Sequence, residues 1–154
     1  MLRSIAAVIV TYIVMVILIM GAFAGLLFGM GPDRLLEPGS WKGTLFFSIA
    51  APSITVLSGL FGGWLCAKIA RGRNAVIALA AVVLVLGFIS AYSTLQKPEP
   101  TDPRESPMTI QQFMEQGREP TWLAIFNPLG GAAAVLIAGL FTAAPRPPRA
   151  GNQS

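Results

Sequence analysis

Four long runs of apolar residues dominate the sequence, and none of them contains a charged residue. The runs cover residues 4–30, 44–67, 75–95 and 121–144. A helix needs about 20 consecutive apolar residues to cross the hydrocarbon core of a bilayer. Lipid offers no hydrogen-bond partners, so a segment of this kind spans the membrane as a helix. The sequence therefore predicts an all-α integral membrane bundle of four transmembrane helices, arranged as two hairpins in a single domain over residues 1–144.

Charged residues are scarce and stand at the ends of these runs. They make up 12% of the chain, against about 25% in soluble domains. The net charge of +4 does not indicate nucleic-acid binding, because this placement is how basic residues orient a membrane protein. The chain has no His and one Cys, Cys66. We therefore expect no imidazole-based site, no intrachain disulfide, no metal, no cofactor and no enzymatic activity.

The first run has an alternative interpretation as a secretory signal peptide. Arg3 precedes an apolar core, and Ala22-Phe23-Ala24 has the small-residue pattern of a cleavage site. The run continues past Ala24 to Met30, which favours a spanning helix. Cleavage stays open as the alternative.

The segments that follow the first and third runs are expected to be loops. Residues 31–43 and 96–120 are interrupted by proline and glycine, which break helices. In the second loop, Thr109–Gly117 has a capping box and one apolar face, which fits a short helix on the membrane surface; a plain solvent loop is the alternative. The tail, residues 145–154, is expected to be disordered and cytoplasmic.

Small residues recur at four-residue spacing in three of the runs. This spacing places them on one helix face and lets another backbone approach closely. The expected helix-packing residues are Gly21, Gly25 and Gly29 in the first run, Gly59 and Gly63 in the second, and Gly130 and Ala134 in the fourth. We expect the glycines of the first run to pack on those of the second.

The distribution of charge predicts the orientation, because Lys and Arg are enriched on the cytoplasmic side. Lys68, Arg71 and Arg73 form the turn between the second and third runs, and Arg3 begins the chain on the same side. All seven acidic residues lie in the two loops. Both termini and the turn are therefore predicted to be cytoplasmic, in the inner (plasma) membrane of the cell.

The same turn and the ends of the runs carry two further expectations. Within Arg71-Gly72-Arg73-Asn74, Gly72 is expected to end one helix and Asn74 to begin the next. Aromatic residues near the ends of the runs are expected to anchor the helices at the membrane interface. These residues are Trp41, Trp64, Tyr92 and Trp122.

The segment Gly62 to Arg73 (GGWLCAKIARGR) resembles a pattern in small bacterial inner-membrane proteins. In that pattern a glycine-paired helix ends in small residues and Arg, then turns directly into the next helix. The residues that carry it here are Gly62, Gly63, Ala67, Ala70, Arg71 and Arg73. The resemblance implies a bacterial source and a four-helix topology, and it assigns no activity.

These features favour a non-enzymatic structural, assembly or modulatory role, with the lipid bilayer and either a second copy or another membrane protein as partners. The alternative is a small uncoupled channel or transporter around Pro52 and Pro128. Its polar path would use Ser48, Ser53, Thr55, Ser58 and Asn127. Cys66 lies near Lys68, but a lone Cys with apolar neighbours is expected to be a packing residue.

Overall fold

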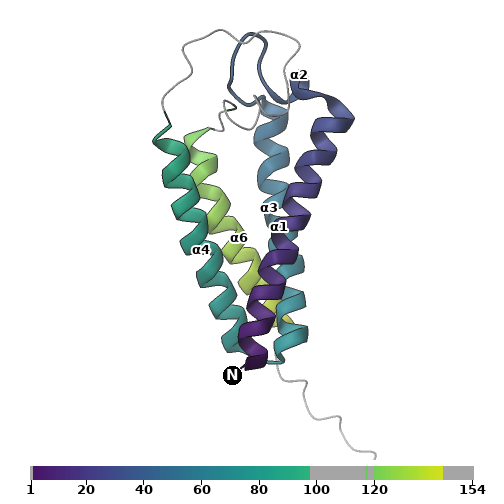
Figure 1. Ribbon diagram of the computed structural model, residues 1–154, viewed down its shortest axis with the longest axis vertical. Coiled ribbons are helices and arrows are strands. Elements are labelled where there is room, and N and C mark those ends of the chain that lie inside the picture. The colour runs from purple at the N-terminus through teal and green to yellow at the C-terminus, as the bar shows by residue number, and fades with distance from the viewer. Residues whose placement is uncertain (1, 98–116, 118–119, 144–154) are drawn as a thin grey trace, which may run out of the picture.

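The protein is a bundle of four long helices, as seen in a computed structural model that describes residues 2–97, 117 and 120–143 (Figure 1). The helices are α1 (Leu2–Met30), α3 (Leu45–Ala70), α4 (Arg73–Leu95) and α6 (Thr121–Thr142). Each is long and apolar enough to cross a membrane. The all-α bundle of four membrane-spanning helices is thus confirmed. The short helix predicted at Thr109–Gly117 falls outside the described residues except for Gly117, and so does the tail, residues 145–154.

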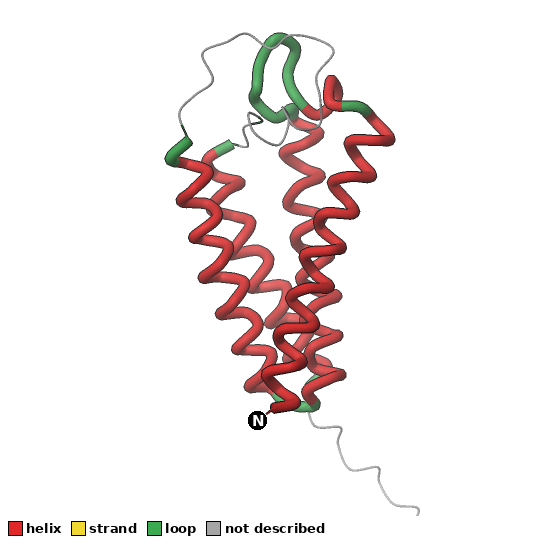
Figure 2. Tube along the Cα trace, viewed as in Figure 1, coloured by secondary structure: helices red, strands yellow, loops and turns green. Residues whose placement is uncertain are grey.

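Successive long helices run in opposite directions, so α3 and α6 run parallel to each other (Figure 1). We call the end that holds the Arg71–Gly72 connection the turn end and the opposite end the loop end. Figure 2 shows the loop between α1 and α3 at the loop end. The pair α1 and α3 and the pair α4 and α6 lie close at the turn end and spread apart toward the loop end (Figure 1).

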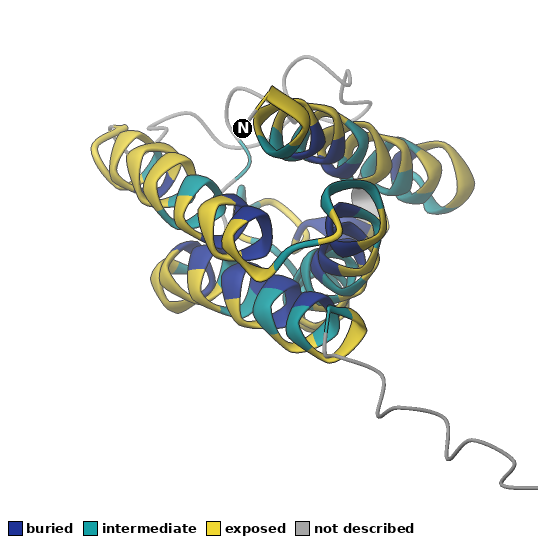
Figure 3. Ribbon diagram, turned by 90° about the horizontal axis from the view of Figure 1, so that it is seen from below, coloured by how far each residue is buried: buried dark blue, intermediate teal, exposed yellow. Residues whose placement is uncertain are grey.

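The apolar core lies in the half of the bundle near the turn end and is built largely from small side chains. Its fully buried members include Ala7, Cys66, Val76, Leu79 and Val135. Figure 3 shows buried residues on the inward faces of the helices and exposed residues on the outward faces. Many of the exposed residues are large and apolar, as expected of helices that face lipid. α6 is the most buried of the four long helices.

The connection between α3 and α4 differs from the expected one. Arg71 adopts the left-handed conformation (φ 56°, ψ 28°), and its N–H donates to the Ala67 carbonyl oxygen. Gly72 is extended (φ −155°, ψ 146°) and precedes α4, and Asn74 lies inside that helix. The prediction of a glycine helix end at Gly72 and a helix start at Asn74 is wrong. Because α3 continues to Ala70, beyond the expected end at residue 67, its left-handed position falls on Arg71.

The first loop is tied to the start of α3. It contains a short helix, α2 (Pro32–Leu35), and one isolated backbone bridge between Leu36 and Gly43. The Thr44 hydroxyl donates to the Arg34 carbonyl oxygen at 3.0 Å and accepts from the Phe47 N–H, which caps α3. A small apolar cluster lies beneath the loop and is made of Leu27, Leu35 and Leu36, with Leu26, Trp41 and Phe47 against it.

Candidate functional site

The closest helix contact in the bundle is between the parallel helices α3 and α6. A Cβ atom built on Gly59 would lie 2.7 Å from the Gly131 carbonyl oxygen and 2.9 Å from the Ala134 Cβ. A Cβ built on Gly63 would overlap the backbone of Val135. Real Cβ contacts are never this short, so only glycine allows the two backbones to meet. We call Gly59, Gly63, Gly131, Ala134, Val135 and Gly139 the α3–α6 seam.

The seam also brings α4 against both helices. A Cβ on Gly139 would lie 3.0 Å from the Gly63 carbonyl oxygen and would overlap the Val76 side chain of α4. Nearer the loop end, a Cβ on Gly87 of α4 would lie 2.6 Å from the Pro128 Cβ of α6. Glycine therefore lets α6 pack closely on two neighbours, which accounts for its burial.

The structure brings together some of the predicted packing residues. Gly59, Gly63 and Ala134 lie in the α3–α6 seam. Gly130 does not, because a Cβ there would lie 2.9 Å from the Phe126 ring of its own helix. Its neighbour Gly131 faces α3 instead. One residue turns a helix by about 100°, so of the predicted pair Gly130 and Ala134 only Ala134 lies in the seam, and Gly131 takes the place expected for Gly130.

The glycines of α1 do not pack on α3. Gly21, Gly25 and Gly29 are exposed, and a Cβ on any of them would meet no atom within 4 Å. The expectation that they would pack on Gly59 and Gly63 is wrong. At this level α1 and α3 meet through the rings of Phe23 and Phe47, whose centroids are 6.0 Å apart. Phe23 lies about 200° round α1 from both Gly21 and Gly25, so the face of α1 that meets α3 is opposite the glycines. We call Gly21, Gly25 and Gly29 the α1 glycine face.

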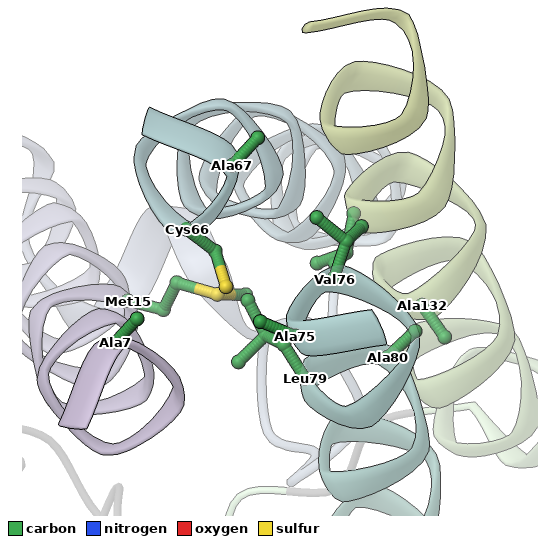
Figure 4. Packing of buried hydrophobic residues seen from close by; sticks show 10 residues of the cluster. Ala7, Met15, Cys66, Ala67, Ala75, Val76, Leu79, Ala80 and Ala132 are labelled. Atoms are coloured by element: carbon green, nitrogen blue, oxygen red, sulfur yellow. The ribbon is translucent and has the colours of Figure 1, made fainter. Parts of the chain in front are cut away.

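Near the turn end, α1 packs into the core through Ala7, Thr11 and Met15. The Met15 thioether lies where a Cβ on Gly62 would stand. Figure 4 shows Met15 and Cys66 pointing into the space between α1, α3 and α4, beside Leu79. Thr11 is fully buried, and its hydroxyl lies beside the Cys66 thiol without a hydrogen bond of standard geometry to any residue in the described part of the chain. Cys66 occupies a packing position in this cluster.

The polar residues near the two helix prolines divide into two groups. The Thr55 hydroxyl lies 3.3 Å from the Asn127 side-chain oxygen across α3 and α6, and 3.1 Å from the Ala51 carbonyl oxygen. Ser53 is exposed and donates to the Ile49 carbonyl oxygen at 2.8 Å. Ser58 is buried and Ser48 is half-buried. The geometry joins Thr55 with Asn127 and turns Ser53 away from them.

The predicted aromatic anchors lie toward both ends of the bundle. The Trp64 ring lies against the Phe61 ring at a tilt of 38°, with centroids 5.6 Å apart, and the Lys68 ammonium lies 4.8 Å from the centroid of the Trp64 ring. Tyr92 and Trp122 are exposed at the loop end. Trp41 packs on the apolar cluster beneath the first loop.

Basic residues from three helix ends meet at the turn end. The Arg3 Nε of α1 donates to the Ile69 carbonyl oxygen of α3 at 2.9 Å. Lys68, Arg71 and Arg73 are exposed beside it. We call Arg3, Lys68, Arg71 and Arg73 the basic cluster.

Within the described ranges, no three His, Cys, Asp or Glu side chains come together to form a metal site. The features that organise the molecule are therefore the α3–α6 seam, the unpacked α1 glycine face and the basic cluster. In comparisons with known proteins, no family model, curated protein or solved structure matches this chain.

Proposed function

We propose that this protein is a non-enzymatic membrane component that associates with a second membrane-spanning helix through the α1 glycine face. The observation that carries the proposal is the contrast between two glycine faces of the same spacing. Gly59 and Gly63 are in backbone contact with α6, whereas a Cβ added at Gly21, Gly25 or Gly29 would meet no atom of another described element within 4 Å. Small residues at this spacing favour close helix association in membranes.

The polar groups of the bundle support a structural role. The described hydroxyls of Ser53, Ser93 and Thr142 each donate to a carbonyl oxygen one turn back in their own helix. Hydroxyls used in this way satisfy the backbone. Thr55 and Asn127 bridge two helices. The four apolar runs also contain no ionisable Asp, Glu, Lys, Arg or His, the groups on which coupled transport and proton transfer in membranes rely.

Crosslinking and affinity purification of the tagged full chain from native membranes tests the proposal. We expect a stable, stoichiometric partner, which is either a second copy or another membrane protein. Gly25→Leu should abolish its recovery, because the added side chain would hold the partner helix away. Ala81→Leu is the matched control, since Ala81 is exposed on α4. Failure of the wild-type chain to retain any partner, or equal recovery with both variants, would refute the proposal.

We further propose that the turn end faces the cytoplasm of a bacterial cell. The support is the basic cluster at that end, because cytoplasmic ends are enriched in Lys and Arg. Labelling of single cysteines placed at Gly72 and at Ser40, in a Cys66→Ser background, tests this in intact cells. A membrane-impermeant thiol reagent should label the cysteine at 40 and not the one at 72. The reverse pattern would contradict the orientation.

A small uncoupled channel is the second candidate, favoured by the contact between Thr55 and Asn127 close to Pro52 and Pro128. Flux of small ions or neutral solutes into vesicles containing the pure protein tests it. A channel predicts flux that Asn127→Leu abolishes. Absence of flux above protein-free vesicles would count against it.

A further inference from the structure

The basic cluster forms one positively charged surface at the turn end. Arg3 belongs to the first turn of α1, Lys68 to the last turn of α3, and Arg73 begins α4. The hydrogen bond from Arg3 to the Ile69 carbonyl oxygen fixes α1 against the end of α3, two residues before Arg71. Residues far apart in the sequence thus bring their charges to a single place.

No acidic side chain offsets these charges within the described part of the chain. Its acidic residues, Asp33 and Glu37, belong to the loop at the opposite end. The side chains of Arg71 and Arg73 make no hydrogen bond or ion pair with any other described residue, and both are exposed. Exposed guanidinium groups that have no other partner are well suited to bind phosphate, because their N–H groups form paired hydrogen bonds with the phosphate oxygens.

Exposed apolar side chains occur near the turn end on each of the three helices, and on α3 and α4 they lie directly beside a basic residue. Ile5 of α1 is 59% exposed, Trp64 of α3 is 40% exposed and Ile77 of α4 is 53% exposed. Trp64 stands one turn before Lys68 and Ile77 one turn after Arg73, each on the same face of its helix and on the membrane side of the basic residue, whereas Ile5 lies about 200° round α1 from Arg3. The Lys68 ammonium over the Trp64 ring joins the charged and the apolar surfaces. A ligand that fits both has an anionic head and apolar chains.

We propose that the turn end binds an anionic phospholipid. The headgroup phosphate pairs with Arg71 and Arg73, and the acyl chains lie along the apolar surface beside Trp64 and Ile77. Basic side chains next to membrane helices attract anionic lipid, and the clustering of these residues concentrates that attraction at one site. This inference does not depend on the proposed partner of α1 or on the orientation in the cell.

Fluorescence quenching by brominated lipids tests the proposal, because the chain has only three Trp residues. In the Trp41→Phe/Trp122→Phe variant, Trp64 is the single reporter and lies beside Lys68. The purified full chain is placed in vesicles that mix phosphatidylcholine with brominated phosphatidylglycerol, and in the converse mixture. We expect phosphatidylglycerol to be enriched over phosphatidylcholine around Trp64 by roughly threefold or more. This selection should weaken in high salt, because ions screen exposed charges.

Three controls separate a site from general enrichment of anionic lipid. Arg3→Gln/Arg71→Gln/Arg73→Gln should bring the selection at Trp64 close to one, whereas Arg34→Gln/Lys42→Gln at the loop end should leave it unchanged. A Trp122-only variant should report no selection. Inorganic phosphate at millimolar concentration should not displace the lipid. Three results would overturn the proposal. The first is equal selection at Trp64 and Trp122, and the second is displacement of the lipid by free phosphate. The third is unchanged selection in the triple variant when its helicity and melting temperature show that it is folded.

Discussion

Gly63 lies directly against the backbone of Val135, so closely that a side-chain Cβ at Gly63 would overlap the Val135 carbonyl oxygen. This contact joins α3 of the first hairpin to α6 of the second. Lipid is as apolar as a helix surface, and association between membrane helices therefore depends on close packing more than on burial of apolar area. The α3–α6 seam is consequently the contact that we expect to hold the two hairpins together.

Thr11 and Thr55 should respond in opposite ways to the same substitution. Thr11→Val removes a buried hydroxyl that makes no hydrogen bond of standard geometry among the described residues and has the weakly polar Cys66 thiol beside it, and we expect it to stabilise the bundle by up to about 1 kcal/mol. Thr55→Val removes the contact with Asn127 and should destabilise the bundle by about 0.5–1 kcal/mol. Reversible unfolding in mixed detergent micelles, followed by circular dichroism, measures both. The same sign for the two variants would contradict the assigned contacts.

The contact between Thr55 and Asn127 should appear as a coupling energy. We expect Thr55→Val, Asn127→Leu and the double variant to give a coupling of about 0.5–1.5 kcal/mol in unfolding free energy, because the two side chains interact directly. Ser53 provides the control, since it is exposed and bonded to its own helix. The cycle of Ser53→Ala with Asn127→Leu should give a coupling near zero.

Arg71 is a site where glycine should be better than the native residue. An L-residue in the left-handed conformation costs roughly 1–2 kcal/mol, and glycine avoids most of this cost. Arg71→Gly is therefore expected to raise the unfolding free energy by up to about 1 kcal/mol. Gly72→Ala should be close to neutral, because its extended backbone suits any residue. A large loss of stability in Gly72→Ala with no gain in Arg71→Gly would show that Gly72, and not Arg71, adopts the left-handed conformation.

The membrane helices could be predicted from the sequence because each corresponds to a single uncharged apolar run. The choice of contacting faces could not, because it depends on side chains that no local pattern identifies. α1 meets α3 through Phe23, which contacts Phe47, and this orientation turns Gly21, Gly25 and Gly29 to the other side of α1, where a Cβ would meet no atom within 4 Å. A rotation by one residue replaces Gly130 with Gly131 in the seam. Gly131, Val135 and Gly139 recur at four-residue spacing, but Val135 is not a small residue. The spacing indicates a packing face only if Val135 is known to contact α3 through its backbone.

The extent of α3 explains another difference. The sequence places Lys68 and Arg71 beyond the apolar run, which suggests that the helix ends before them. In the structure α3 continues through Lys68 to Ala70, because charged residues at the end of a spanning helix lie outside the hydrocarbon and keep the helical backbone. This extension moves the left-handed residue from the glycine to Arg71.

Cys66 should tolerate replacement far better than the seam glycines. It is fully buried among Met15, Leu79 and small side chains, and the hydroxyl of Cys66→Ser can donate to the carbonyl oxygen one turn back, as Ser53 and Ser93 do. We expect a change in unfolding free energy of about 1 kcal/mol or less, with any cellular activity retained. Loss of activity in a Cys66→Ser protein that stays folded would show that the thiol has a chemical role.

The most direct test of the α3–α6 seam is to compare Gly63→Ala with Gly25→Ala in unfolding free energy. Both changes add one methyl group to a helix, and alanine is the better helix former by about 1 kcal/mol. At Gly25 the new Cβ meets no atom within 4 Å, so we predict a gain of up to about 1 kcal/mol. At Gly63 it would overlap the Val135 backbone, so we predict a loss of about 1–3 kcal/mol. If Gly63→Ala stabilised the protein as much as Gly25→Ala, α3 and α6 would not meet through their backbones, and the seam would not be the contact that joins the two hairpins.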